Sequence, residues 1–184
     1  MINDILGYRF SESDRLFFDA NVWLAIYPPP SKPNGHWQNL YTAMLKKVKK
    51  AMSDMFIDST VISEYLNTYT RLVFKQRPLE FIDLTFKEYR IKCSSDYKKA
   101  ARQAEQNMEE ILSLANLHVV DCAISGFDRN VMLFDFGKGC SDWNDLVIVE
   151  VCKGGGYSLV TNDGDFKDVT GVTILTHNPK LFAR

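Results

Sequence analysis

The stretch Arg15-Leu16-Phe17-Phe18-Asp19 is a short apolar run that ends in an acid, and residues 20–26 follow it directly. This pattern predicts a buried strand that passes into a short helix, with Asp19 at the carboxyl end of the strand. Four more segments have the composition of short strands: 55–57, 117–120, 157–161 and 172–175. Because strands alternate with helical segments over the whole length, the sequence predicts an α/β fold around a parallel sheet of about five strands.

Helices are predicted where apolar residues recur at the spacing of one helical face. Five segments show this spacing: 37–52, 61–73, 79–89, 97–115 and 127–136. Ser59 or Thr60 is expected to cap the second of these helices, and Asp128 the fifth. Residues 141–153 are ambiguous, because Leu146–Val151 has strand-like composition while Ser141-Asp142 is typical of a helix start. The block 36–116 is longer than a minimal α/β unit needs, and we interpret it as a helical insertion.

Composition limits the class of protein. The 184 residues suit one domain spanning 1–184, and 46% hydrophobic with 24% charged residues excludes a disordered chain. No apolar run approaches the roughly 18 residues that cross a bilayer, so no membrane association is expected. The start of the chain does not resemble a secretory signal, which predicts a cytoplasmic location. The cysteines, Cys93, Cys122, Cys140 and Cys152, form no C-x-x-C pair and are expected to be free thiols.

Charge gives no whole-molecule attraction to nucleic acid, because the net charge is -1. Basic residues nevertheless gather in two clusters that could bind phosphates. One comprises Lys46, Lys47, Lys49 and Lys50, and the other comprises Arg90, Lys92, Lys98, Lys99 and Arg102. Each cluster is either an RNA-binding surface or an ordinary solvated helix face, and the sequence leaves both interpretations open.

Acidic residues follow the predicted strands. Asp19 closes the first strand, Asp163 comes shortly after residues 157–161, and Glu64 lies early in the helix that follows 55–57. The carboxyl ends of parallel strands meet at one edge of a sheet, so these acids are expected to lie near one another. Asp142 and Asp145 would join them on one face if 141–153 is a helix, but would point to opposite faces if it is a strand.

Several carboxylates in one place repel one another unless a cation compensates them. We therefore expect raised pKa values in the metal-free site. Oxygen ligands favour Mg²⁺ or Mn²⁺ over zinc. The histidines, His36, His118 and His177, have no metal-ligand spacing.

Four segments together resemble the acidic motifs of PIN-domain nucleases, in the same order along the chain. They are Leu16–Asn21, Ser59–Leu66, Asp142–Ile148 and Leu159–Phe166. The last contains Thr161-Asn162-Asp163-Gly164-Asp165-Phe166, which is similar to the Thr-x-Asp-x-x-Phe signature of VapC-type toxins from bacterial toxin–antitoxin pairs. Residues 28–56 and 75–116 do not match the family pattern.

The resemblance implies a three-layer α/β/α sandwich and an endoribonuclease that uses Mg²⁺ or Mn²⁺. It assigns catalysis and metal ligation to Asp19, Glu64, Asp145 and Asp163, with Asp142 and Asp165 as further acids at the metal. It also assigns supporting roles to Asn21 and Thr161, and Asp58 departs from the small hydroxyl residue expected at its position. The implied partners are an RNA substrate and an antitoxin protein, and a homodimer is left open.

Two other functions stay open at the level of sequence. A haloacid-dehalogenase-like phosphatase would use Asp19 as a nucleophile but needs a second Asp where this chain has Asn21. A PIN-like module without catalytic activity would only bind RNA or protein. Fold-level resemblance does not by itself choose among them.

Overall fold

The centre of the protein is a parallel sheet. The computed structural model describes residues 1–30, 35–121, 127–139 and 141–182. Six strands form the sheet in the order β1-β6-β5-β2-β3-β4, and every pair is parallel. The strands are β1 (Ile2–Asp4), β2 (Arg15–Phe18), β3 (Asp54–Asp58), β4 (Leu117–Val120), β5 (Ser158–Val160) and β6 (Ile174–Thr176).

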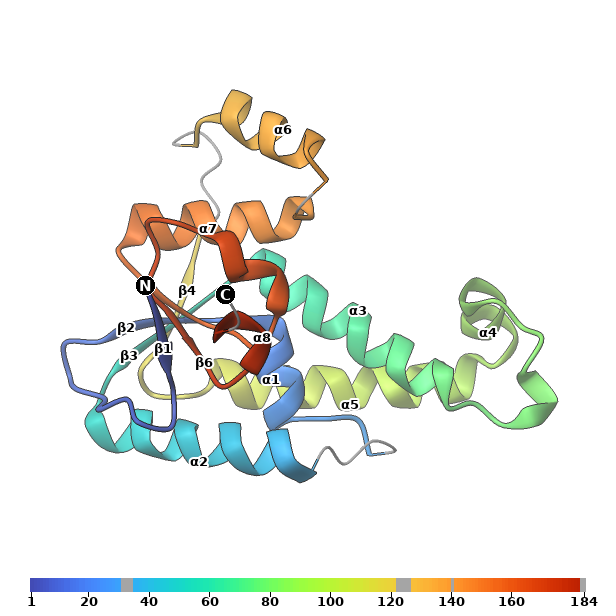
Figure 1. Cartoon of the computed structure of the whole chain (residues 1–184). Helices are drawn as coiled ribbons and strands as arrows, with labels where there is room; N and C mark the ends of the chain where they lie inside the picture. The colour runs from blue at the N-terminus through green and yellow to red at the C-terminus, as the bar shows by residue number, and fades with distance from the viewer. Residues whose placement is uncertain (31–34, 122–126, 140, 183–184) are drawn as a thin grey trace.

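Helices cover both faces of this sheet. Figure 1 shows α7 on one side and α2 and α5 on the other, which confirms the three-layer α/β/α fold. The helices are α1 (Ala20–Ile26), α2 (Gly35–Ala51), α3 (Ser59–Lys75), α4 (Phe86–Lys92), α5 (Ser94–Leu112), α6 (Arg129–Gly137), α7 (Trp143–Gly155) and α8 (Pro179–Phe182). Among the described residues, the short 3₁₀ helices are η1 (Leu79–Phe81) and η3 (Gly164–Asp168). No described helix is long and apolar enough to cross a membrane.

The central strand β2 is deeply buried after its first residue. Leu16, Phe17 and Phe18 are all 0% exposed, as expected for a parallel strand with helices on both faces. Trp23 of α1 stacks on Phe18 with ring centroids 4.9 Å apart. Burial of each such side chain contributes about 1.5–3 kcal/mol, so this segment anchors the core.

Strand β1 was not predicted. It has only three residues, and its backbone pairs with β6 from Ile2 opposite Ile174 to Asp4 opposite Thr176. A three-residue segment with one apolar side chain carries no periodic signal, so only its pairing partner makes it a strand.

The start of α3 corrects one expectation. The cap is Asp58, whose side chain accepts a hydrogen bond from the Val61 backbone N–H at 2.9 Å, and neither Ser59 nor Thr60. An Asp side chain caps a helix as a Ser or Thr side chain does, so Asp58 can serve at the position where a small hydroxyl residue was expected. Asp128 caps α6 as predicted, accepting from Asn130 and Val131.

The single helix predicted over 79–89 is wrong. The chain forms η1 and then starts α4 at Phe86, because Thr85 and Glu88 make a reciprocal capping box. The Arg77 guanidinium holds the turn between them by donating to the carbonyls of Phe81, at 2.7 Å, and of Ile82.

The ambiguous segment is helical from residue 143, since α7 spans Trp143–Gly155. Asp142 caps α7, and Gly156 ends it in the left-handed conformation with φ 65°. Glycine adopts that conformation without the steric cost of a Cβ atom.

The predicted insertion forms an arm. Helices α3 and α5 pack side by side and extend beyond the sheet, with α4 at the tip (Figure 1). Helix α2, by contrast, packs on α1 in the body of the domain. Cys93 and Cys152 are buried free thiols, as predicted, while Cys122 and Cys140 lie outside the described residues.

Candidate active site

The predicted acids meet where the strand order reverses. From β2 the chain moves outward through β3 to β4, and it then returns to place β5 on the other side of β2. Phe18 and Val160 are opposite each other in register, so Asp19 and Thr161 are neighbours at the carboxyl ends of these two strands. Such a reversal point is where ligands bind in open parallel sheets.

Asp19 is buried and held by two polar neighbours. The residue is only 4% exposed. The Thr161 hydroxyl donates to Asp19 Oδ2 at 2.6 Å, and Asn21 Nδ2 donates to the same oxygen. Asn21 Nδ2 also lies 3.2 Å from Thr161 Oγ1. The structure therefore places both predicted supporting residues against Asp19.

Asp163 is tied to the same hydroxyl through the backbone. Its N–H donates to Thr161 Oγ1 at 3.0 Å, and its Oδ1 accepts from the N–H of Asp165 at 3.0 Å, which starts η3. The exposed Asp165 side chain lines a pocket of about 280 Å³ beside α6 and α7, which Asp145 also lines. Asp163 is thus bonded to the residues around Asp19, whereas Asp165 lies toward the pocket beside α6.

Asp142 and Asp145 cap the first turn of α7 together. Asp142 Oδ1 accepts from the Asp145 N–H at 2.9 Å, and Asp145 Oδ2 accepts from the Asp142 N–H at 3.4 Å. The helical geometry puts both acids at one helix end, as the helical alternative required. Asp142 therefore has a structural role whatever else it does.

The electrostatics show that these acids share one environment. The pKa of Asp19 is raised to about 7, by burial first and to a smaller extent by the charges of Glu64 and Asp163. Burial, followed by the charge of Asp142, raises the pKa of Asp145 to about 7. The pKa of Glu64 is also raised, by burial first and then by Asp145, Asp142 and Asp163. The pKa values of these three groups are raised, as expected, but burial is the largest cause and repulsion between carboxylates the smaller one.

The donor set suits a hard divalent cation, but the side chains are not arranged around one point. Within the described ranges, no three His, Cys, Asp or Glu side chains converge tightly enough to hold a metal ion. Ligation would therefore require other carboxylates of the set to rotate toward Asp19, whose Oδ2 is already held by Thr161 and Asn21. Two of the histidines have other partners, because His118 bonds to Asp54 and His177 to Asp4.

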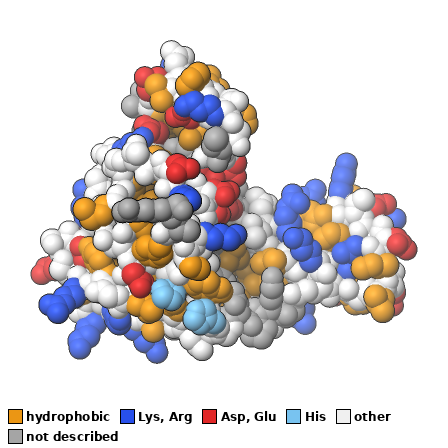
Figure 2. Space-filling model, in the orientation of Figure 1, with side chains coloured by type: hydrophobic (Ala, Val, Ile, Leu, Met, Phe, Trp, Pro, Cys, Tyr) orange, Lys and Arg blue, Asp and Glu red, His pale blue; other side chains and the backbone are white. Residues whose placement is uncertain are grey.

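The second basic cluster lies on the arm. Figure 2 shows acidic side chains at the edge of the body that faces the arm, and basic side chains on the arm itself. A groove of about 370 Å³ between α3 and α5 is lined by Lys98, Arg102, Tyr97 and Asn67. Leu66, which follows Glu64 by two residues on α3, also lines the groove, so the groove begins about 3 Å further along the helix axis.

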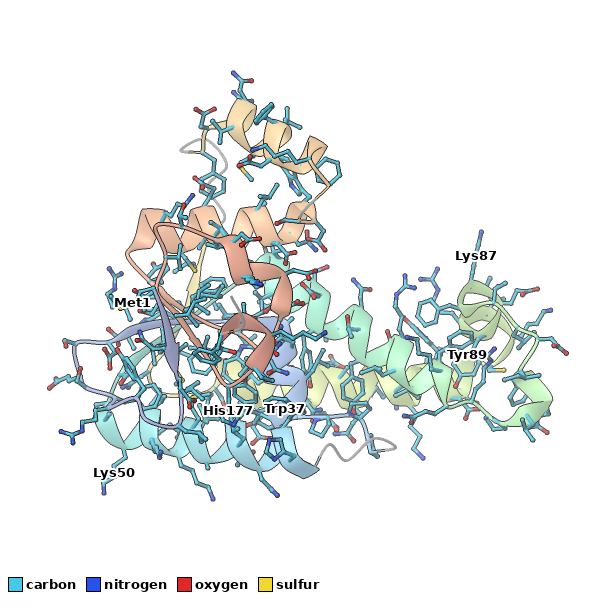
Figure 3. All side chains as sticks on the ribbon, in the orientation of Figure 1. Met1, Trp37, Lys50, Lys87, Tyr89 and His177 are labelled. Atoms are coloured by element: carbon cyan, nitrogen blue, oxygen red, sulfur yellow. The ribbon has the colours of Figure 1, made fainter. Side chains whose placement is uncertain are left out.

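The first basic cluster is at the other end of the molecule. Helix α2 ends at Ala51, three residues before β3 begins, so Lys49 and Lys50 lie near the amino ends of the strands. Figure 3 shows Lys50 far from Lys87 and Tyr89 of the arm. All four lysines of this cluster are exposed.

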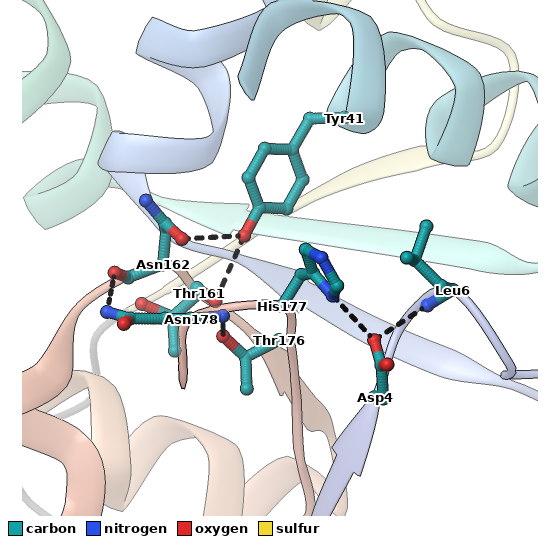
Figure 4. A network of polar contacts seen from close by, with 8 residues as sticks. All are labelled: Asp4, Leu6, Tyr41, Thr161, Asn162, Thr176, His177 and Asn178. Atoms are coloured by element: carbon teal, nitrogen blue, oxygen red, sulfur yellow. Dashed lines mark hydrogen bonds and ion pairs between the residues drawn. The ribbon is translucent and has the colours of Figure 1, made fainter. Parts of the chain in front are cut away.

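Two residues that the sequence pattern did not single out also contact this site. The Tyr41 hydroxyl lies 3.4 Å from the Thr161 carbonyl oxygen, and Asn178 Nδ2 donates to the Asn162 carbonyl at 2.7 Å (Figure 4). Neither belongs to an acidic motif, and no local pattern predicts contacts across such sequence separations.

Comparison with known proteins supports the same architecture. A chain in the crystal structure of VapBC2 from Rickettsia felis, bound to a DNA fragment from their promoter, superposes with a TM-score of 0.55. The two sequences are 18% identical, and the match covers 88% of this chain and 98% of that chain. At this identity the likeness shows a shared fold. No curated protein matches the sequence.

The family model of the PIN domain matches residues 16–172, which is most of the chain. The match begins in the strand that precedes Asp19 and ends beyond Asp163. PIN domains are in general nucleases, which are hydrolases, and generally use divalent metal ions. The chain described here belongs to the PIN domain family.

Proposed function

We propose that this protein is an endoribonuclease that hydrolyses RNA phosphodiester bonds with Mg²⁺ or Mn²⁺. The proposed metal ligands are Asp19, Glu64, Asp145 and Asp163, and Asp142 and Asp165 would contact the metal through water. The observation that carries the proposal is the mutual electrostatic influence of acids from four different parts of the chain. A divalent cation would relieve that repulsion and favour the ionised carboxylates.

The chain's own residues would prepare the site for this chemistry. A bound Mg²⁺ or Mn²⁺ would supply a Lewis acid for the scissile phosphate and a water of lowered pKa. Thr161 and Asn21 hold Asp19 Oδ2, which fixes the orientation of this carboxylate. The α7 cap places Asp145 at the start of its helix. Such partners orient metal ligands and support their affinity.

Single-stranded RNA is the substrate that we propose. The groove beside Glu64 presents two cationic side chains, Lys98 and Arg102, against one acid, Glu105, together with the aromatic ring of Tyr97. Cationic grooves with aromatic side chains bind single strands by phosphate attraction and base stacking. Lys99, Arg90 and Lys92 extend the positive charge along the arm.

A toxin role with an antitoxin partner is the biological setting that we propose, in the cytoplasm. The Rickettsia felis structure contains VapBC2 on promoter DNA, and this chain shares that fold. Helix α6 supports a protein partner, since Val131, Leu133, Phe134 and Phe136 are each 48–68% exposed. Exposed apolar side chains gathered on one helix are typical of interaction surfaces. An antitoxin or a second copy of the chain would cover them.

The decisive experiment is cleavage of a mixed RNA pool by purified protein. We expect cleavage with Mg²⁺ or Mn²⁺ and none with a chelator. Asp19→Asn and Asp145→Asn should each abolish it, because each substitution removes a ligand charge while keeping the side-chain shape. The loss should exceed the roughly 10- to 100-fold effect of removing an outer partner of a ligand.

Asp54→Asn is the matched control, because Asp54 pairs with His118 at the amino end of β3, away from the site. It should keep full activity. Undiminished cleavage by both site variants, or by wild type in chelator, would contradict the proposal. RNA binding without cleavage would favour the inactive module, and phosphate release from a generic monoester would favour the phosphatase.

A further inference from the structure

Asn162 lies between two residues of the proposed site, and its polar groups are held from three other parts of the chain. Figure 4 shows the contacts from Asn178 and Tyr41. Its backbone N–H donates to Asn21 Oδ1 at 2.9 Å. Its carbonyl accepts from Asn178 Nδ2 at 2.7 Å, and its side-chain Oδ1 accepts from the Tyr41 hydroxyl at 3.3 Å. Asn162, which joins Thr161 to Asp163, is therefore held at its backbone N–H, at its carbonyl and at its side chain.

Asn178 is itself held rigidly. Its backbone N–H donates to Thr176 Oγ1 at 2.9 Å, and its Oδ1 accepts from the Lys180 N–H at 3.0 Å. Thr176 ends β6 and is 0% exposed. The side-chain amide of Asn178 is thus anchored to the end of β6, so it can hold the Asn162 carbonyl in a fixed position.

Tyr41 approaches from the opposite side. It is 0% exposed and belongs to α2, which packs in the helical layer of the body. Its hydroxyl lies 3.3 Å from Asn162 Oδ1 and 3.4 Å from the Thr161 carbonyl oxygen. These bonds are long, and we expect each to contribute less than the Asn178 bond.

The position of residues 161–163 decides where two site acids lie. The Thr161 hydroxyl donates to Asp19, and the same oxygen accepts from the Asp163 N–H. A rotation of the Asn162 peptide would therefore displace Asp163 and disturb the hydrogen bond to Asp19 together.

We propose that Asn178 and Tyr41 are positioning residues of the active site. They hold Asn162 so that the Thr161 hydroxyl against Asp19 and the backbone of Asp163 keep the positions from which these two carboxylates can reach a divalent metal. The inference rests on the proposed function. A purely structural role, in which these bonds only secure the ends of β5 and β6, makes a different prediction. It would lower stability with and without metal alike and leave metal affinity unchanged.

The test measures Mn²⁺ binding as the rise in thermal unfolding midpoint with Mn²⁺ concentration, alongside RNA cleavage. In Asn178→Ala we expect apparent Mn²⁺ affinity to fall by about tenfold, the lower end of the effect of removing partners that orient metal ligands. The maximal cleavage rate should fall while KM for RNA stays unchanged, and higher Mn²⁺ should restore part of the rate. Tyr41→Phe should show the same pattern with a smaller loss.

Two variants serve as matched controls. Asn107→Ala removes a partly buried amide that donates to the Tyr65 hydroxyl, and Tyr27→Phe removes a hydroxyl that donates to Glu110. Neither bond touches residues 161–163, so both variants should keep wild-type Mn²⁺ affinity and KM.

The outcomes separate this inference from the proposed function. Wild-type protein without any Mn²⁺-induced shift would overturn the metal site, and the positioning role with it. A normal wild-type shift with an equal shift in Asn178→Ala would overturn the positioning role alone. Equal losses of Mn²⁺ affinity in Asn178→Ala and Asn107→Ala would also overturn the positioning role alone. Support would also come from Asn21→Ala combined with Asn178→Ala, whose joint loss should be smaller than the product of the single losses, because both hold one peptide.

Discussion

At the scale of the residue, Asp19 has a buried carboxyl group whose ionisation is costly to the stability of the metal-free protein. A carboxylate that loses contact with water is costly unless it is compensated. The hydrogen bond from Thr161 lowers its pKa, yet burial outweighs this and the pKa stands at about 7. The metal-free folded protein therefore holds a proton on this group at pH values where the unfolded chain has lost it.

The pH dependence of stability follows from this difference. Asp19 and Asp145 have pKa values near 7 in the folded state, against an ordinary value of 3.8. Between these values the folded state binds more protons than the unfolded state, so stability falls as pH rises. We predict that, in chelator, the unfolding midpoint declines from about pH 4 to about pH 7, and that Mg²⁺ or Mn²⁺ reduces the decline.

Glu64→Gln tests the cause of this decline. The substitution removes one of the charges that raise the pKa of Asp19. The metal-free variant should be more stable than wild type near neutral pH, by up to about 1 kcal/mol because solvent screens a partly exposed group. It should also gain less stability from added metal. A variant that is less stable in chelator and gains as much from metal would show that Glu64 is not part of the acidic site.

At the scale of the element, the helical structure of α7 decides where Asp142 and Asp145 lie. Composition alone allowed a strand over Leu146–Val151, but the reciprocal cap between Asp142 and Asp145 starts a helix. The helix places both acids at one edge, whereas a strand would have separated them. The same kind of local chemistry explains the break before α4, where Thr85 and Glu88 start a new helix.

Two substitutions at Asp142 distinguish its cap from a role at the metal. Asp142→Ala should destabilise the protein by about 1 kcal/mol, the usual effect of losing an N-cap, and should lower activity because Asp145 loses its partner. Asp142→Asn keeps the cap and removes only the charge, so stability in chelator should be maintained while Mn²⁺ affinity falls. Thermal unfolding with and without Mn²⁺ measures both. An Asp142→Asn variant with wild-type affinity would leave Asp142 as a cap only.

At the scale of the whole molecule, the arm gives the acidic site a basic neighbour. Both basic clusters are exposed, but only the one on the arm faces the edge of the sheet where the acids gather (Figure 2). The lysines of α2 run toward the amino ends of the strands. The fold therefore favours the arm as the surface that would position RNA.

This preference predicts a difference between two double variants. In the Asp19→Asn background, Lys98→Ala with Arg102→Ala should weaken binding of single-stranded RNA and lower its salt dependence by a slope of about 0.7 for each lost phosphate contact. Lys46→Ala with Lys50→Ala removes the same charge from α2 and should leave both unchanged. Fluorescence titrations at several salt concentrations measure this. Equal behaviour of the two double variants would show that the arm has no special role.

The sequence alone was sufficient for the α/β class, the parallel sheet and the order of the acidic segments. These features have local signals: apolar runs of strand length, helical periodicity, and acids directly after strands such as Asp19 after Phe18. Strand β1 and the break between η1 and α4 were missed, because the first depends on pairing with β6 and the second on a side-chain cap.

Only the tertiary structure decided which acids share an environment, how deeply Asp19 is buried, and which residues hold the chain around Asn162. Asn21 and Thr161 are 140 residues apart in the sequence, and Tyr41 and Thr161 are 120 apart. Contacts at such separation are set by the order of strands in the sheet and by the packing of helices on it. Residue type and periodicity act over a few neighbouring positions, so they place an acid at the end of a strand but cannot determine which other side chains will meet it there.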